Sequence, residues 1–297
     1  MASFLLAGLL VVCLVSAVSH ASAKGDGVIL ASALRKNSGR LDANMNALIW
    51  SLNFSKSAGA NIFIWPEFAI NFPTTLSVSR DSLYPLCDSD VPQQGWAPDK
   101  DCNFSFSNSS YSKAIGCAAR SAQMYVSVNV CEIVACSSEG SCPADGHYLY
   151  NSELVFSDKG VLVAKYHKSH PWYEKAFDAP ADPSKNIVTF NTNSFGRFGV
   201  FTCKDILFAQ PGDNLVQVAG VSRLIYSVAV SALGSLGEDA LEFVQKAWTK
   251  RLNATLFASN LGTRGGSGIF VSGNKVEPYR VQNIQGDSGK LVFTRMP

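Results

Sequence analysis

The chain has 297 residues, of which 47% are hydrophobic and 16% charged, and its formal net charge is +2. This length suffices for one large domain with a substantial core or for two small ones. No run of Lys and Arg forms a basic face, so the sequence predicts no nucleic-acid partner.

The first 23 residues have the pattern of a secretory signal peptide. Residues 4–18 are a nearly unbroken apolar run, too short to span a bilayer comfortably, and they lead into the small-x-small site Ala21-Ser22-Ala23. The segment before the run has no Lys or Arg, and a retained signal anchor is the alternative. No second long apolar segment follows. We therefore expect residues 24–297 to form a secreted, extracellular domain without a transmembrane segment.

Seven cysteines follow the signal, and their spacing is uneven. In an oxidising compartment six clustered cysteines predict three disulfides, and six cysteines allow fifteen pairings. The seventh, Cys203, stands apart and is either a free, reactive thiol or a buried structural one. The clustered six are Cys87, Cys102, Cys117, Cys131, Cys136 and Cys142.

Four triplets match the acceptor pattern for N-glycosylation. Such triplets are common by chance, but together with the signal they are consistent with the secretory pathway. Their acceptors are Asn53, Asn103, Asn108 and Asn253.

Helices and buried strands alternate in the first half of the chain. Apolar residues from Leu41 to Leu52 recur at helical spacing. After a glycine turn, the apolar run at 62–65 predicts a strand buried on both faces. A helix at 111–123 and a strand at 125–130 repeat this order, and a cysteine-rich loop follows.

The second half is rich in strands. Residues 148–156 and 161–166 flank the turn sequence Ser-Asp-Lys-Gly and predict a β-hairpin. A helix is expected at 238–252. The alternation predicts one α/β layered domain. Further strands are expected at 187–190, 198–201, 224–230, 255–259, 269–271 and 291–294.

Three polar residues lie just beyond predicted strands. Glu67 follows the run at 62–65 and a proline, Lys168 follows the second hairpin strand, and Cys203 follows the strand at 198–201. Groups beyond strand ends are the ones that reach a ligand crevice in layered α/β proteins. Taken singly, each also has an ordinary explanation as a solvated glutamate, a surface lysine or a core cysteine.

The sequences around these residues resemble the three motifs of the nitrilase (carbon–nitrogen hydrolase) superfamily. Residues 62–67, IFIWPE, resemble its strand-Pro-Glu motif, and residues 165–170, KYHKSH, resemble its lysine motif. Residues 198–208, FGVFTCKDILF, resemble its cysteine motif as found in the vanin (pantetheinase) and biotinidase branch. The resemblance covers the chain from about residue 25 onward, and other similar segments lie at 81–85, 257–260 and 266–270.

The resemblance implies a four-layer αββα sandwich and a role for each residue. Glu67 would be the general base, Lys168 the electrophilic stabiliser and Cys203 the nucleophile. The backbone N–H of Lys204 would join Lys168 in the oxyanion hole. Lys168 is preferred to Lys165 because the family motif places its lysine after the Tyr-His pair.

These residue types suit the hydrolysis of a linear amide. A thiol is mostly protonated at neutral pH, so Glu67 would take the proton as Cys203 attacks the carbonyl. Lys168 would stabilise the oxyanion, and Glu67 would then activate water to hydrolyse the thioester. The resemblance implies a pantetheine-like or biotinyl-amide-like substrate.

Three features depart from the family pattern. A second glutamate often follows the lysine, and Glu174 is the candidate, although its spacing is irregular. The vanin branch usually continues into a second C-terminal domain, which has no counterpart in this chain. Residues 227–237 are mostly small where the branch carries a tryptophan and a proline near the substrate pocket, which predicts a reshaped or roomier site.

This chemistry requires a small-molecule amide but no cofactor and no metal. No His-Glu-x-x-His pattern occurs, and His167 and His170 are expected to orient the lysine loop rather than bind zinc. The glycine-rich stretch at 263–268 lacks the strand and helix of a phosphate loop and is expected to be a turn. The alternative function is that of a non-catalytic secreted relative, binding a ligand covalently through Cys203.

Overall fold

The computed structural model describes residues 29–35, 38–72, 78–102, 110–136, 142–172, 176–230, 234–262 and 265–297. The expected signal peptide, Glu174 and the acceptors Asn103 and Asn108 lie outside these ranges. The other two acceptors, Asn53 and Asn253, are exposed. None of the helices in the described ranges has the length and apolar character needed to cross a bilayer.

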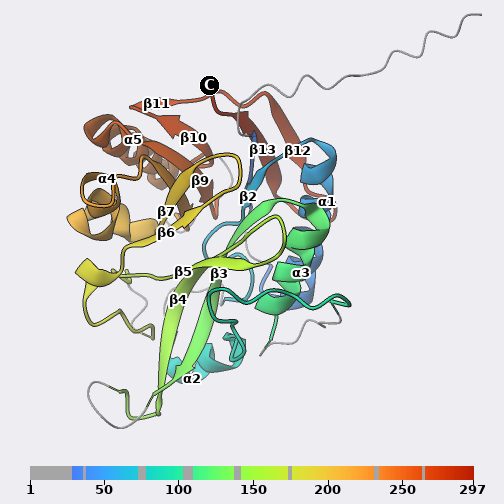
Figure 1. Cartoon of the computed structure of the whole chain (residues 1–297), viewed down its shortest axis with the longest axis vertical. Coiled ribbons are helices and arrows are strands. Elements are labelled where there is room, and N and C mark those ends of the chain that lie inside the picture. Colours follow the sequence, from blue (N-terminus) through green and yellow to red (C-terminus); the bar gives the residue numbers. More distant parts are fainter. Residues whose placement is uncertain are drawn as a thin grey trace, which may run out of the picture.

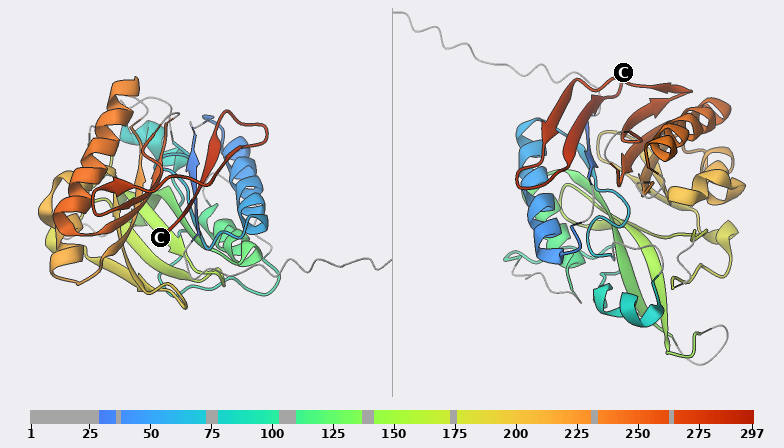
Figure 2. Two further views of the ribbon diagram at one scale, coloured as in Figure 1. Left: turned by 90° about the horizontal axis from the view of Figure 1, so that it is seen from above. Right: turned by 180° about the vertical axis from the view of Figure 1, so that it is seen from behind.

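Two β-sheet layers lie face to face between two layers of helices (Figure 1). Helices α1 (Leu41–Ser57) and α3 (Ser112–Ala122) cover one side. Helices α4 (Asn214–Gln217) and α5 (Gly234–Leu252) cover the other, and the same order is visible from above in Figure 2. The predicted αββα sandwich is confirmed.

We call the two sheet layers the first and the second half-sheet. The first half-sheet has the order β5-β4-β3-β2-β1, with β13 and then β12 beyond β1. Strands β1, β2 and β3 are parallel, whereas β3, β4 and β5 form an antiparallel meander. These strands are β1 (Ile29–Leu34), β2 (Ile62–Ile64), β3 (Tyr125–Ala135), β4 (His147–Phe156), β5 (Leu162–His167), β12 (Arg280–Asn283) and β13 (Lys290–Arg295).

The second half-sheet has the order β6-β7-β8-β9, and the antiparallel strands β10 and β11 extend it from β9. Strands β7, β8 and β9 are parallel. A single residue pair, Leu34 with Asn260, joins the two half-sheets between β1 and β9. The strands are β6 (Val188–Asn191), β7 (Arg197–Thr202), β8 (Arg223–Val228), β9 (Thr255–Asn260), β10 (Gly268–Val271) and β11 (Asn274–Lys275).

The period-two alternation of strand side chains builds the core between these layers. In β2, Phe63 belongs to the cluster that packs against α1, whereas Ile62 and Ile64 face the second half-sheet. All three are buried, which confirms the strand predicted from the continuous apolar run. Strand β1, with Leu30 and Ala31 on opposite sides, was not predicted although it is central.

The remaining predicted helices and strands are also confirmed, most with ends shifted by a few residues. Strand β3 continues five residues beyond the predicted end and pairs with β4 over its whole extension. Short elements complete the chain: α2 (Arg80–Leu83), η1 (Tyr84–Leu86), η2 (Pro183–Lys185), η3 (Cys203–Leu207) and η4 (Ala209–Asp213).

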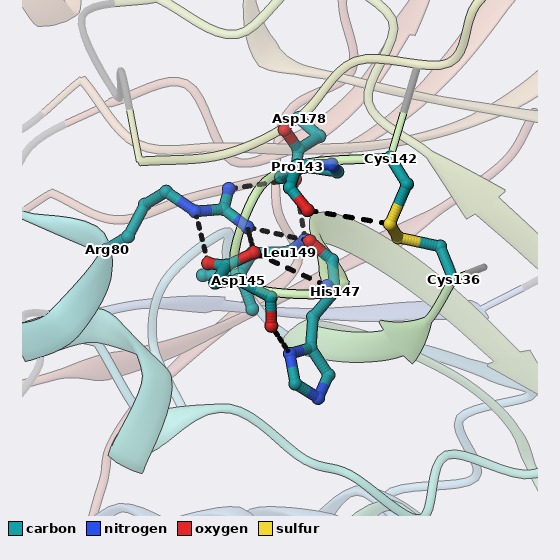
Figure 3. The surroundings of a disulfide bond; sticks show 8 residues. All are labelled: Arg80, Cys136, Cys142, Pro143, Asp145, His147, Leu149 and Asp178. Atoms are coloured by element: carbon teal, nitrogen blue, oxygen red, sulfur yellow. Dashed lines mark hydrogen bonds and ion pairs between the residues drawn. A yellow bond between two sulfur atoms is a disulfide. The ribbon is translucent and has the colours of Figure 1, made fainter. Parts of the chain in front are cut away.

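The six clustered cysteines form three disulfides, which are Cys87–Cys131, Cys102–Cys117 and Cys136–Cys142. The last of these closes the loop between β3 and β4 (Figure 3). Beside it, Arg80 of α2 forms ion pairs with Asp145 and Asp178, each at 2.8 Å. The disulfide and these ion pairs fix the far end of the long hairpin.

Candidate active site

The ends of β2 and β5 bring Glu67 and Lys168 together inside the protein. Lys168 Nζ lies 2.7 Å from Glu67 Oε1, and the two side chains are 1% and 0% exposed. A buried charge is costly unless it is paired, so this contact is the condition for keeping both groups in the interior. The structure thus joins two residues that are far apart in sequence.

Two asparagines hold the Glu67 carboxylate in place. Asn151 Nδ2 of β4 donates to Glu67 Oε1 at 2.9 Å, and Asn129 Nδ2 of β3 donates to Asn151 Oδ1 at 2.6 Å. Asn129 Oδ1 also accepts from the backbone N–H of Phe68 at 3.2 Å. These bonds fix both the side chain of Glu67 and the backbone that follows it.

Cys203 lies at a sharp turn between β7 and η3. Its φ of 52° is in the left-handed region, which costs a non-glycine residue about 1–2 kcal/mol. The Tyr226 hydroxyl donates to the carbonyl of Cys203 at 2.9 Å and holds this backbone. A strained strand-to-helix turn of this kind presents a nucleophile at the end of a sheet.

Asp205 ties the loop that carries Lys168 to the turn that carries Cys203. Its Oδ2 accepts from the Tyr166 hydroxyl at 2.7 Å, and its Oδ1 accepts from the backbone N–H of His170 at 2.9 Å. The His170 ring nitrogen Nδ1 is also 2.9 Å from Oδ1. His170 therefore orients the lysine loop, as the sequence predicted.

The environment of Cys203 keeps its sulfur protonated at rest. Burial raises the pKa of the thiol well above its ordinary value, and the charge of Glu67 adds to the rise. The charge of Lys168 and a hydrogen bond with the Ala229 backbone act in the opposite direction but are outweighed. Attack by this thiol would therefore require a proton acceptor, and Glu67 is in contact with it.

A second buried carboxyl group, Glu153, lies beside Glu67 and was missed by the sequence analysis. It is 0% exposed and hydrogen bonds to the hydroxyls of Ser127, at 2.6 Å, and Ser227. Burial raises the pKa of Glu153 to about 7, and the charge of Glu67 contributes to the rise. The sequence did contain a pattern that could have indicated Glu153. Polar residues recur at every second position of β3 and β4, and such residues lie on one face of a sheet.

Two other residues of the lysine motif, Lys165 and His167, pair with Glu132. Lys165 Nζ is 2.7 Å from Glu132 Oε1, and His167 Nε2 is 3.0 Å from Glu132 Oε2. Ser152 donates to the same carboxylate at 2.7 Å. His167, directly before Lys168 in the chain, is therefore held by Glu132.

A pocket of about 140 Å³ opens beside the nucleophile. Cys203 and Lys204 line it, and the segment 227–237 contributes Val228, Val230 and Gly237. Helix α5 also contributes Ala240, Leu241 and Val244.

Comparison with known proteins agrees with this fold. Residues 30–254 match the carbon–nitrogen hydrolase family, and the chain belongs to that family. An amidase from Nesterenkonia of the nitrilase superfamily has a similar fold, with a TM-score of 0.61 at 13% identity, over 91% of this chain and 92% of that one.

Relatives with higher sequence identity come from the branch that the motifs indicated. Human pantetheinase is 34% identical over 267 residues, which are 86% of this chain and 49% of the relative. Biotinidase from Takifugu rubripes is 33% identical over 249 residues, which are 80% of this chain and 47% of the relative. The chain therefore spans about half the length of these relatives.

Proposed function

We propose that the protein is a secreted amidase that hydrolyses a linear carbon–nitrogen bond through Cys203, Glu67 and Lys168. The observation that carries this proposal is the convergence of a strained cysteine turn on a buried Glu67–Lys168 pair. Family membership supports the reaction class. The roles of the three residues rest on their chemistry and contacts.

In the first step, the Cys203 sulfur attacks the amide carbonyl carbon as its proton passes to Glu67. The carbonyl π electrons move to oxygen, and the Lys168 ammonium and the Lys204 backbone N–H stabilise the resulting oxyanion. Collapse of this intermediate breaks the carbon–nitrogen bond. Glu67 returns the proton to the leaving amine, which leaves an acyl thioester on Cys203.

In the second step, water attacks the thioester as Glu67 takes one of its protons. The carbon–sulfur bond breaks, the sulfur recovers the proton, and the carboxylic acid leaves. The raised pKa of Cys203 fits this sequence, because the resting thiol needs a base at the moment of attack and also leaves as a thiol. Each proton transfer uses the same carboxylate.

Pantetheine and biotinyl amides are the first substrates to test. Pantetheinase and biotinidase are among the relatives with about one third identical residues. The three disulfides and the exposed acceptors Asn53 and Asn253 support export through an oxidising compartment.

The test is amine release from pantetheine and from biocytin by the purified protein and by Cys203→Ser. We expect release by the wild type and its loss in the variant. Intact-protein mass spectrometry on the same samples detects an acyl adduct at Cys203. A stable adduct without turnover would contradict the amidase proposal and support the alternative, a non-catalytic protein that binds a ligand covalently through Cys203. Absence of both amine and adduct would refute Cys203 as the nucleophile for these substrates.

A further inference from the structure

The pocket beside Cys203 has an apolar lining. Seven of the twelve described residues that line it have hydrocarbon side chains, including Ile206, Val228 and Leu241. One hydrogen-bonding group of the lining, the Tyr226 hydroxyl, already donates to the Cys203 carbonyl at 2.9 Å. A ligand group here meets hydrocarbon, and a polar group without a hydrogen-bond partner would lose binding free energy.

The position of the pocket identifies the part of the substrate that it receives. The leaving amine must reach Glu67, and the carbonyl oxygen must face Lys168 and the Lys204 N–H. The described lining includes Cys203 and Lys204 but neither Glu67 nor Lys168. The acyl group, which remains on Cys203 in the thioester, therefore extends into this pocket.

The mouth of the pocket is also apolar. Trp172 and Leu207 line it and are 41% and 55% exposed. Lys204 Nζ lies 5.4 Å from the Trp172 ring centroid and 5.8 Å from that of Phe208, so its charge is held against aromatic faces.

The volume sets the size of the acyl group. The pocket holds about 140 Å³. An apolar protein cavity of about 150 Å³ binds benzene, so a group of roughly six carbons matches this space.

We propose that this pocket is an acyl-binding site for an unsubstituted hydrocarbon group of roughly six carbons, so that the enzyme prefers amides of apolar acids to polyhydroxylated acyl groups such as that of pantetheine. The proposal rests on the proposed amidase function, because it assigns the substrate class of the same site. It also gives Val228, Val230 and Gly237, which line the pocket, a role in substrate choice.

The test is a series of amides that share one fluorogenic aryl amine and differ in the acyl chain, from acetyl through butanoyl, hexanoyl and decanoyl. We expect kcat/KM to rise about fourfold for each methylene up to about six carbons and then to level, since a buried methylene contributes about 0.8 kcal/mol. The 4-methoxybutanoyl amide, equal in length to hexanoyl, should be about tenfold worse or more, because its ether oxygen is buried without a donor.

Variants at one half-buried position of α5 test the location of the site. Val244→Phe fills the pocket and should lower the hexanoyl-to-acetyl ratio of kcat/KM by about tenfold or more. Val244→Ala should move the optimum to a longer chain. The control is Phe243→Ala, at an adjacent residue that is 73% exposed and not among the lining residues, which should leave the chain-length profile unchanged.

A second readout separates this proposal from the amidase proposal. Acylation of Cys203 by p-nitrophenyl acetate, butanoate and hexanoate, followed by mass spectrometry, requires no amide cleavage. Acylation that increases with chain length, without turnover of any amide, would support the proposed acyl-binding site and refute the proposed amidase function. Amide turnover with no chain-length preference, or with pantetheine preferred to hexanoyl amides, would refute the proposed acyl-binding site but not the proposed amidase function.

Discussion

Two lysine–glutamate pairs arise from the same short motif, and only one of them borders the nucleophile. Lys168 lies 2.7 Å from Glu67, and Lys165, three residues earlier, lies 2.7 Å from Glu132. In both pairs the carboxylate is almost fully buried, at 0% and 3% side-chain exposure. The distance and burial of an ion pair therefore do not distinguish the proposed reactive site from a structural pair.

The two pairs differ in their neighbours. Glu67 also accepts from Asn151 and influences the pKa of Cys203, so its charge acts on a nucleophile. Glu132 also contacts Ser152 and His167, and its pairing stabilises the meander. The identity of the third partner decides the function, and this comparison can be tested by matched substitutions.

The largest expected effect comes from removing the charge of each glutamate in turn. Glu67→Gln should lower kcat/KM for amide hydrolysis by about 10²–10⁴, because the general base is lost. Glu132→Gln should change kcat/KM by less than about threefold, since its carboxylate contacts no reacting group. Steady-state kinetics on both variants checks this difference, and an equal loss in the two would contradict the assignment of Glu67.

The lysines provide a second pair of variants. Lys168→Met should lower kcat by about 10²–10³, because one donor to the oxyanion is lost. Lys165→Met should instead lower the free energy of unfolding by about 1–3 kcal/mol, since it leaves the Glu132 carboxylate with fewer partners. Kinetics and urea unfolding on each variant measure the two effects. The distinction fails if Lys165→Met loses activity while its stability is retained.

A smaller effect concerns how stability depends on pH. The pKa of Glu153 is raised from 4.5 to about 7, so the folded state retains a proton that the unfolded state releases. The stability that Glu153 contributes is therefore complete below about pH 4.5 and falls as the pH rises to about 7, by at most about 3 kcal/mol. The free energy of unfolding of the wild type minus that of Glu153→Gln, measured with urea across this pH range, isolates the contribution of Glu153.

Glu132 should show the opposite dependence. Burial alone would raise its pKa, but His167 and Lys165 outweigh burial and lower it. Its contribution is present above the ordinary glutamate pKa of 4.5 and is lost as the pH falls through the lowered value. The free energy of unfolding of the wild type minus that of Glu132→Gln should therefore decrease as the pH falls into the acid range. A decrease of this difference toward neutral pH instead would show that the carboxylate is not held by these cations.

The sequence indicated that Glu67, Lys168 and Cys203 lie together, but it did not indicate every strand around them. Each motif residue follows a strand with strong apolar character, and parallel strand ends meet at one edge, so Glu67, Lys168 and Cys203 could be expected to converge. Strand β1 was missed because its small residues, Ala31, Ser32 and Ala33, lack the contrast of an alternating pattern.

Contacts between the half-sheets could not be predicted in the same way. Ser227 meets Glu153 only because β8 packs near β4 across the sandwich, and no periodicity along either strand encodes that distance. The function of Lys165 was excluded by the order of the motif, but its partner Glu132 depends on the register between β3 and β4. Side-chain pairing across strands requires the register, which the sequence pattern leaves open.

The separation of the molecule into two half-sheets also affects how its thiols mature. All six disulfide-forming cysteines lie in segments before β4, packed with the first half-sheet, whereas Cys203 follows β7 of the second. The first half-sheet is completed by β13, whose pairing with β1 joins Ile29 to Arg295. During synthesis the six cysteines therefore emerge before the nucleophile does, and oxidation can finish among them. In the folded structure Cys203 is buried and remains a free thiol, which is the state that the proposed mechanism needs.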